Sequence, residues 1–264
     1  MADVNERVPD LPLLAALQAL DLLYVVRGDV DYRLDAAALV ASVTPDYAGI
    51  HYDGAGTLTI DLVDLYHKID DFALDGIAAV STPDFANGRV LFGAARAYGI
   101  HFGMSAEVTG ATSLFEVEAF RISQTTAAIT AITQATPGVV TAPGHGRSNG
   151  DRVKIAGPIV GMTEVVDKIF TVAAVAGDDF ALTDAEGVNI ATGGYGAWAS
   201  GGTVALAVGI IEISRDFPNG SLGASAASFP VMGVAGDAVE LYAKNEDNAN
   251  NIAISHCHLW MAGL

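Results

Sequence analysis

The sequence contains a single cysteine, Cys257, among its 264 residues. Without a second cysteine no disulfide can form within the chain, so packing and assembly have to supply its stability. Basic residues are also scarce, with 13 Lys and Arg against 31 Asp and Glu and a formal net charge of −18. This balance argues against a nucleic-acid partner, whose backbone requires clustered Lys and Arg, and against an anionic membrane surface.

Signals for secretion, membrane insertion and catalysis are lacking as well. Residues 1–6 have neither the basic start nor the apolar core of a signal peptide, so we do not expect secretion by that route. The longest apolar stretch, residues 11–26, is interrupted by Pro12, Gln18 and Asp21 and is too short to cross a bilayer. There is no phosphate loop, dinucleotide fingerprint or paired-cysteine motif. The sequence therefore predicts a protein that is not an enzyme and binds no cofactor.

Charge of either sign is infrequent relative to apolar residues. Charged residues make up 17% of the chain and apolar residues 51%. A monomer has to coat itself with polar groups, and this composition supplies few of them. The balance predicts buried interfaces between subunits.

The sequence pattern predicts an all-β structure along most of the chain. Short apolar runs at residues 89–91, 98–105 and 115–123 are separated by Gly, Pro and Asn, which is typical of strands and tight turns. Between residues 57 and 75 a helical and a strand pattern compete, and we favour strand. Residues 218–228 are rich in Gly, Ser and Ala and are predicted to form a loop.

Further strands are expected at residues 204–214, 238–244 and 251–260. In the last of these, alternation places Ile252, Ile254, His256, His258 and Trp260 on one face and Cys257 on the other.

Residues 1–45 form a distinct segment. Strands are predicted at residues 22–27 and 30–34, with a turn at Gly28 and Asp29 and a short helix whose N-cap is Asp35. This order resembles the attachment segment near the N-terminus of many phage fibre and tail proteins. The Arg27-Gly28-Asp29 tripeptide matches an integrin-binding motif, but Gly and Asp also suit a turn, and we interpret the match as chance.

Residues 129–204 form a glycine-punctuated β module. Its apolar runs at residues 153–155, 170–175 and 180–183 are each bounded by Gly, Asn or Asp. The order Gly-His-Gly, Ser-x-Gly-Asp-x-Val, Phe-Thr-Val and a closing Ser-Gly-Gly-Thr-Val resembles a small β-barrel module. It is similar to the first catalytic cysteine half-domain of ubiquitin-activating enzymes and to its copies in tailed-phage virion proteins. The resemblance implies no activity, because the activating chemistry resides in domains that are absent here.

The remaining residues resemble a jelly roll. The sequence Gly-Asp-Ala-Val-Glu-Leu-Tyr-Ala-Lys-Asn at residues 236–245, a polar loop and a final strand resemble the last two strands of tumour-necrosis-factor-like and C1q-like proteins. Residues 98–102 and 115–118 look like earlier strands of the same sandwich. The expected fold is an all-β jelly-roll sandwich, residues 46–125 and 205–264, with a small β-barrel module inserted at residues 126–204 and a mixed attachment segment at residues 1–45. Proteins of this fold are typically homotrimers, which the resemblance implies here.

Histidines and carboxylates are the candidate metal ligands. His256 and His258 share one strand face, and three copies near a trimer axis could bring six imidazoles together. No carboxylate or cysteine partner follows at metal spacing, so we interpret both as polar rings at the trimer interface, together with Tyr242 and Trp260. An acidic run is interpreted as a solvated face, because its spacing does not match a calcium loop. The run consists of Asp61, Asp64, Asp70, Asp71 and Asp75. No metal is predicted.

Aromatic residues in Gly-rich loops offer a second functional hypothesis. Tyr195, Trp198 and Phe217 are placed where rings stack on sugars or anchor a partner, although burial accounts for them equally well. The sequence predicts a non-enzymatic virion protein of a tailed phage, assembled in the host cytoplasm as a homotrimeric fibre or decoration protein on the head or tail. Residues 1–45 would bind other virion proteins. The alternative is a glycan-binding module that recognises the host surface, and a depolymerase would need paired carboxylates.

Overall fold

The computed structural model describes residues 22–27, 30–35, 45–108, 110, 112–217, 220 and 222–264. At residues 22–27 and 30–35 and at Phe217 it describes the backbone alone. Contacts divide the chain after Pro45 into two compact units, residues 1–45 and 46–264.

Within the first unit, two strands form an antiparallel hairpin. β1 (Leu22–Arg27) pairs with β2 (Val30–Asp35), with Leu22 opposite Asp35 and Arg27 opposite Val30. Both strands were predicted from the sequence. The predicted turn at Gly28 and Asp29 and the helix beyond Asp35 lie outside the described residues.

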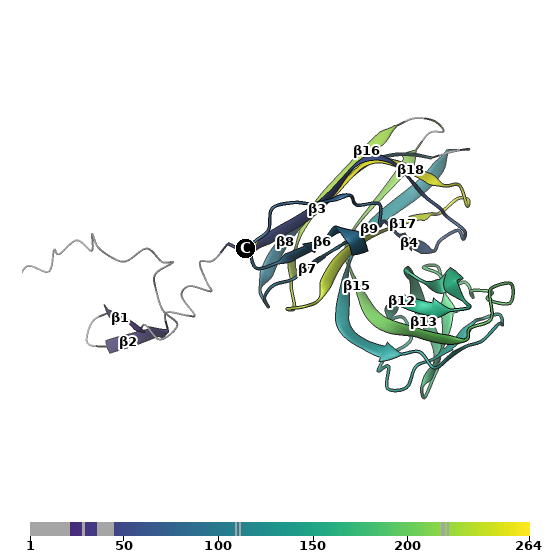
Figure 1. The fold of residues 1–264 in the computed structure, drawn as a ribbon, viewed down its shortest axis with the longest axis horizontal. Coiled ribbons are helices and arrows are strands. Elements are labelled where there is room, and N and C mark those ends of the chain that lie inside the picture. The colour runs from purple at the N-terminus through teal and green to yellow at the C-terminus, as the bar shows by residue number, and fades with distance from the viewer. Residues whose placement is uncertain are drawn as a thin grey trace, which may run out of the picture. The chain divides into compact units, whose positions relative to one another are not determined.

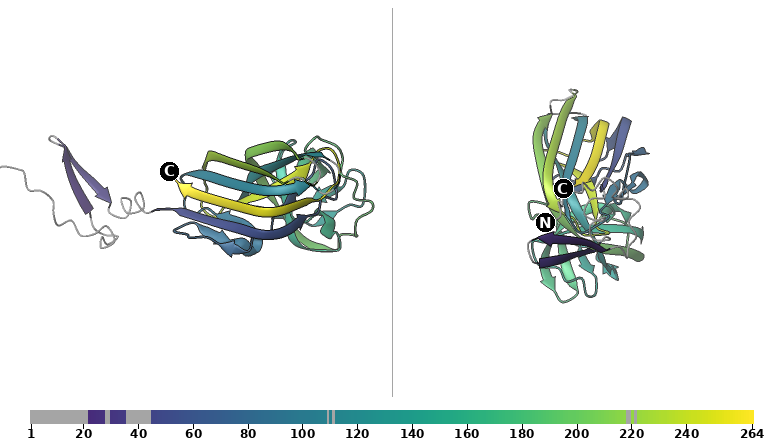
Figure 2. Two further views of the ribbon diagram at one scale, coloured as in Figure 1. Left: turned by 90° about the horizontal axis from the view of Figure 1, so that it is seen from above. Right: turned by 90° about the vertical axis from the view of Figure 1, so that its left-hand side faces the viewer.

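The second unit contains a five-stranded antiparallel sheet. Its strands follow the order β16, β8, β18, β3 and β5, and Figure 2 shows the four long ones side by side. Their bounds are β16 (Gly223–Met232), β8 (Ala97–Val108), β18 (Ile252–Gly263), β3 (Tyr47–Leu58) and β5 (Leu74–Asp75). β16 and β5 are therefore the end strands of this sheet.

A second sheet packs against the first. In the sandwich it follows the order β6, β7, β17, β9 and β15, and its strands continue into the inserted module. The bounds are β6 (Thr82–Asp84), β7 (Arg89–Leu91), β17 (Ala238–Asn245), β9 (Ser113–Ala128) and β15 (Ser200–Phe217).

The pairing of the eight principal strands is nested. Taken in chain order, the first pairs with the eighth (β3 with β18), the second with the seventh (β7 with β17), the third with the sixth (β8 with β16) and the fourth with the fifth (β9 with β15). Such nesting across two sheets is the arrangement of a jelly roll. The protein is thus all-β, with two antiparallel sheets in a jelly roll, as the sequence predicted.

The module is inserted between β9 and β15, the two strands of the innermost hairpin. Its strands are β10 (Ala131–Ile132), β11 (Val139–Thr141), β12 (Arg152–Val160), β13 (Lys168–Ala176) and β14 (Asp179–Thr183). β9 and β15 run unbroken from the sandwich into the module (Figure 1). β4 (Tyr66–Lys68) pairs with β13 of the module and with β17 of the sandwich, so it joins the two bodies.

Two apolar cores stabilise these bodies. The sandwich core is lined by alternate residues of both sheets, such as Ile100 and Phe102 from β8 and Val239 and Leu241 from β17. The module core is built around residues such as Phe170 and draws on a residue outside the insert, Leu65. Complete burial of one such side chain contributes roughly 1.5–3 kcal/mol.

Three expectations for local structure need correction. Ile252 and Ile254 do not share a face with His256, because the register of β18 shifts between Ile254 and His256; both isoleucines lie in the core with Cys257. The predicted loop at residues 218–228 instead contains the start of β16, where Ala and Ser alternate along an end strand. Residues 57–75 hold the end of β3, short strands β4 and β5 and irregular chain, rather than one continuous pattern.

Among the described residues, helices are confined to short 3-10 turns at Phe85–Asn87 and Thr163–Val165. None of the helices in this part of the chain is long and apolar enough to span a membrane.

Candidate functional site

The two sheets of the sandwich present very different outer faces. The outer face of the second sheet lies under the module and is called the covered face here; it carries Glu116, Glu118, Glu240, Tyr242 and Lys244, all buried. The outer face of β16, β8, β18 and β3 is not covered by any other described part of residues 46–264 and is called the open face.

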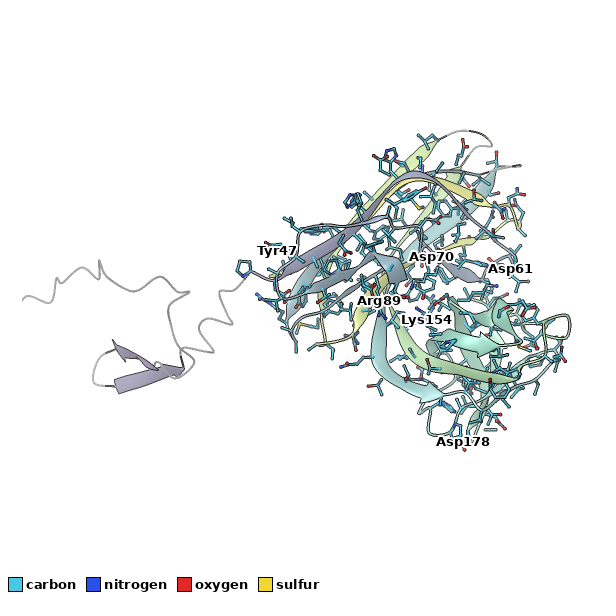
Figure 3. The ribbon with its side chains drawn as sticks, viewed as in Figure 1. Tyr47, Asp61, Asp70, Arg89, Lys154 and Asp178 are labelled. Carbon is cyan, nitrogen blue, oxygen red and sulfur yellow. The ribbon has the colours of Figure 1, made fainter. Side chains whose placement is uncertain are left out.

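Glu240 is the centre of the covered face. Lys154, on β12 of the module, donates from Nζ to both oxygens of Glu240, at 2.9 and 2.7 Å (Figure 3). Lys68 of β4 lies 3.3 Å from Glu240, and the Tyr242 hydroxyl donates to it at 2.7 Å. Although burial acts to raise it, the pKa of Glu240 is lowered, because Lys68 and Lys154 favour the carboxylate. Module and sandwich are therefore joined by a buried cluster in which Lys154, Lys68 and Tyr242 all bind the carboxylate of Glu240.

A second cluster lies along β9. Arg152 of the module donates to Glu118 at 2.6 Å, and Lys244 lies 3.3 Å from Glu116. The hydroxyl of Tyr66 also donates to Glu116. Burial, together with the carboxyl group of Glu246, raises the pKa of Glu116 to about 8. Glu116 thus has a stronger tendency to be protonated than Glu240.

Among the described residues, the carboxylates of Glu116, Glu118 and Glu212 lie close enough to one another to share a cation. Two of the three are already paired with Lys244 and Arg152. The protein's own cations therefore fill the role that a metal would take.

All four lysines of the sequence are buried in ion pairs. Lys68, Lys154, Lys168 and Lys244 are each at most 8% exposed. Lys168 pairs with Asp61, whose pKa falls to about 2 because Lys168 and His67 bond its carboxylate in spite of burial. Asp61, predicted to lie on a solvated acidic face, is thus engaged in ion pairs.

Tyr242, a predicted trimer contact, lies on the covered face. It is fully buried and packs edge-to-face on Phe120, with ring centroids 5.5 Å apart. The module covers it within the same protomer, so it has no surface to offer to a second copy. The reason is the insertion itself, which buries a face that the strand pattern alone leaves outward.

The open face differs in both charge and side-chain size. None of its strands, as the structure describes them, contains Lys or Arg. Gly49 and Gly103 let aromatic rings lie directly on the backbone, and a Cβ at Gly103 would come within 2.5 Å of the His258 ring. The result is a surface of mostly small and aromatic groups, on which Asp53 and Glu107 are carboxylates.

Four of the six histidines gather on this face. His51, His101 and His258 line a shallow pocket of about 530 Å³ together with Trp260 and Ile77. An adjoining depression of about 280 Å³ shares His258 and also contains His256. His256 lies 2.9 Å from Asp53, and the Trp260 ring stacks on Tyr47 with centroids 5.8 Å apart. The predicted interface residues His256, His258 and Trp260 thus share one surface.

Large apolar side chains are exposed at both ends of the same sheet. At the β16 end these are Leu222, Phe229, Met232 and Val234, with 63%, 47%, 62% and 43% of their surface exposed. At the β5 end they are Leu74, Ile77 and Val80. Sequence reasoning missed both ends and the roles of His51 and His101. The lack of Lys and Arg in all the strands of one sheet was the signal that could have revealed them.

The proposed glycan contacts lie elsewhere. Tyr195 and Trp198 are half-buried and pack against the module core, and the Trp198 indole donates to the Gly201 carbonyl at 3.1 Å. Phe217 ends β15, and its side chain lies outside the described residues. Packing accounts for the two described rings without a ligand.

Comparison with known proteins finds similarity among solved structures alone. No protein-family model matches the sequence, and no curated protein sequence matches it. Among solved structures, the chain is similar to that of Eiger TNF from S. frugiperda, with a TM-score of 0.42 and 8% identity over 84% of this chain and 93% of that one.

Proposed function

We propose that this protein is a non-enzymatic structural component of a tailed-phage particle, a fibre or decoration protein that assembles as a homotrimer through the open face. The observation that carries the proposal is the low charge of the open face, whose strands contain no Lys or Arg and three of the 31 acidic residues, Asp53, Asp75 and Glu107. Copies of such an acidic chain repel one another, and the repulsion is least where the surface has least charge. A second copy of the chain is therefore the partner that this face fits.

The two apolar ends of the sheet suggest how the copies meet. Met232 and Phe229 project at the β16 end, whereas the pocket between Ile77 and Trp260 lies toward the β5 end. Because the two ends differ, contact between one copy's β16 and the next copy's pocket is heterologous, and heterologous contacts form a ring when the rotation from copy to copy closes. A ring of three agrees with the trimers implied by the jelly-roll resemblance.

The virion role draws on the sequence resemblances of residues 1–45 and 129–204 to segments of phage proteins. In this proposal residues 1–45 bind the particle, and the trimeric body presents the module outward. Removing residues 1–44 should leave a folded trimer that no longer joins particles, measured by light scattering and by incorporation into virions. Retained incorporation would contradict the attachment role.

The mass of the purified protein in solution tests the assembly directly. Light scattering should give three times 27.1 kDa for the full chain. Met232→Asp should reduce this to one copy, because it places a charge in an apolar contact. Val188→Asp is the matched control, since Val188 is 61% exposed but lies on the module, and it should remain a trimer. A monomeric wild-type chain, or equal behaviour of the two variants, would contradict the proposal.

A further inference from the structure

The largest pocket of the open face contains three imidazoles on three adjacent strands. His258 on β18 is the register partner of His51 on β3, and Trp260 on β18 is the partner of His101 on β8. His101 is therefore the diagonal neighbour of His258 across the strand pair. All three histidines and the indole line the same pocket.

Few charges face these rings. The pocket lining holds no carboxylate and no basic residue other than the three histidines. On β3, Asp53 is engaged by His256 at 2.9 Å; on β5, Asp75 accepts a bond from the amide of Phe85; on β8, Glu107 lies in a separate depression. β16 contributes no ionisable side chain.

One cation also lies at this end of the sheet, because Arg96 donates to the carbonyl of Leu264 at 3.1 Å. Protons added to the pocket would meet one another, and the pocket lining holds no carboxylate to receive them. Burial and the neighbouring His101 already lower the pKa of His258 in the single protomer. Covering the pocket with another copy would oppose protonation further, since burial disfavours the charged imidazole.

We propose, building on the proposed trimer, that assembly through the open face is released by mild acid, when His51, His101 and His258 take up protons. An imidazole that is buried in an interface resists protonation. Separated copies therefore bind protons more readily than assembled ones, so acid favours separation.

The direction of this response distinguishes it from general charge effects. The sequence has a pI of about 4.4, so acidification toward that value reduces the net negative charge of every copy. Weaker mutual repulsion would strengthen association of an acidic protein. Separation on acidification therefore requires a local source of positive charge at the interface, which the three histidines provide.

The test compares the full-length wild-type chain with a His51→Gln, His101→Gln, His258→Gln triple variant by light scattering at pH 8 and pH 5.5. Glutamine keeps polar contacts but does not titrate. The wild type should pass from three copies to one, with a dissociation constant that rises about tenfold or more, while the triple variant should remain trimeric at both pH values. His145→Gln is the control, because His145 lies in the module and off the open face, and it should separate as the wild type does.

Each outcome bears on a different claim. A wild-type trimer at both pH values, or a triple variant that separates as the wild type does, would overturn the proton response and leave the trimer intact. A wild-type monomer at pH 8 would instead overturn the proposed assembly. Circular dichroism at both pH values should be unchanged; loss of the β signal at pH 5.5 would assign the acid response to unfolding and overturn the inference.

Discussion

The covered and open faces are the outer faces of the two sheets of one sandwich, and they differ in the side chains that they carry. The covered face concentrates the lysines of the chain against glutamates, and the open face has neither Lys nor Arg in its described strands. A buried charge is tolerated only when its partner is held in fixed geometry. The module is covalently tied to β9 and β15, so it can hold Lys154 and Arg152 in register with their partners. A separate copy lacks that constraint, which favours a surface of small apolar and aromatic groups.

The largest effect should come from breaking the covered face at its centre. Glu240→Ala leaves Lys154 and Lys68 buried without their shared carboxylate, and we expect a loss of about 3–5 kcal/mol in the free energy of unfolding. Denaturant unfolding at neutral pH measures this loss. Asp53→Ala is the matched control, because its ion pair with His256 is exposed, and it should cost well under about 1 kcal/mol. Equal effects would mean that the covered cluster does not hold module and sandwich together.

The next largest effect is expected from Trp260→Ala on the open face, and it should weaken the proposed trimer rather than the fold of the protomer. Trp260→Ala removes a half-buried ring that lines the main pocket and stacks on Tyr47. We expect trimer dissociation to become easier by about 2 kcal/mol, as for aromatic anchors of interfaces. Concentration-dependent light scattering gives that value, and unfolding of the separated protomer reports the folding contribution. A change confined to unfolding would remove Trp260 from the interface.

A smaller effect, an increase in the free energy of unfolding, is expected from Glu116→Gln. The Glu116 pKa of about 8 exceeds the ordinary value of 4.5, so the folded protein retains a proton that the unfolded chain releases between these pH values. Its contribution to stability therefore decreases as pH rises from about 4.5 to 8. Glu116→Gln keeps an acceptor for Tyr66 and removes this loss, and should stabilise the protein at pH 8 by about 1 kcal/mol. Unfolding measured from pH 5 to 8 should show a shallower decline for the variant; a steeper one would contradict the assignment.

The smallest effect should follow Trp198→Ala. This ring packs on the module core from a half-buried position, and its loss should cost about 1–2 kcal/mol of module stability without altering trimer mass. Binding to host-surface glycan is the contrasting readout. Binding that disappears in a folded Trp198→Ala variant would favour a receptor-recognition role for the module over the structural one.

Much of the fold was predictable because its determinants are local. Alternation of apolar residues along β8 and β17 and the Gly and Asn turns around them indicate strands that lie half in a core. β16 was not predictable in this way, because Ala and Ser along an end strand carry little apolar contrast. The position of Ile254 relative to His256 depended on a register shift, which adds a residue without any change in composition.

For the candidate site too, features that depend on local sequence were predictable and features that depend on distant contacts were not. His256, His258 and Trp260 could be assigned to one face because β18 is regular from His256 onward. Tyr242 follows an equally regular strand, but its burial depends on where a distant insert packs, which spacing within β17 does not encode. His51 and His101 join the pocket only through pairing of β3 and β8 with β18, contacts made between residues far apart in sequence.

The burial of every lysine also affects how the folded protein reacts with reagents that modify amines. Acylating reagents and amine-directed cross-linkers should modify the lysines of the folded protein slowly, since the amines of Lys68, Lys154, Lys168 and Lys244 are enclosed in ion pairs. The appearance of four additional adducts by mass would record the separation of module and sandwich.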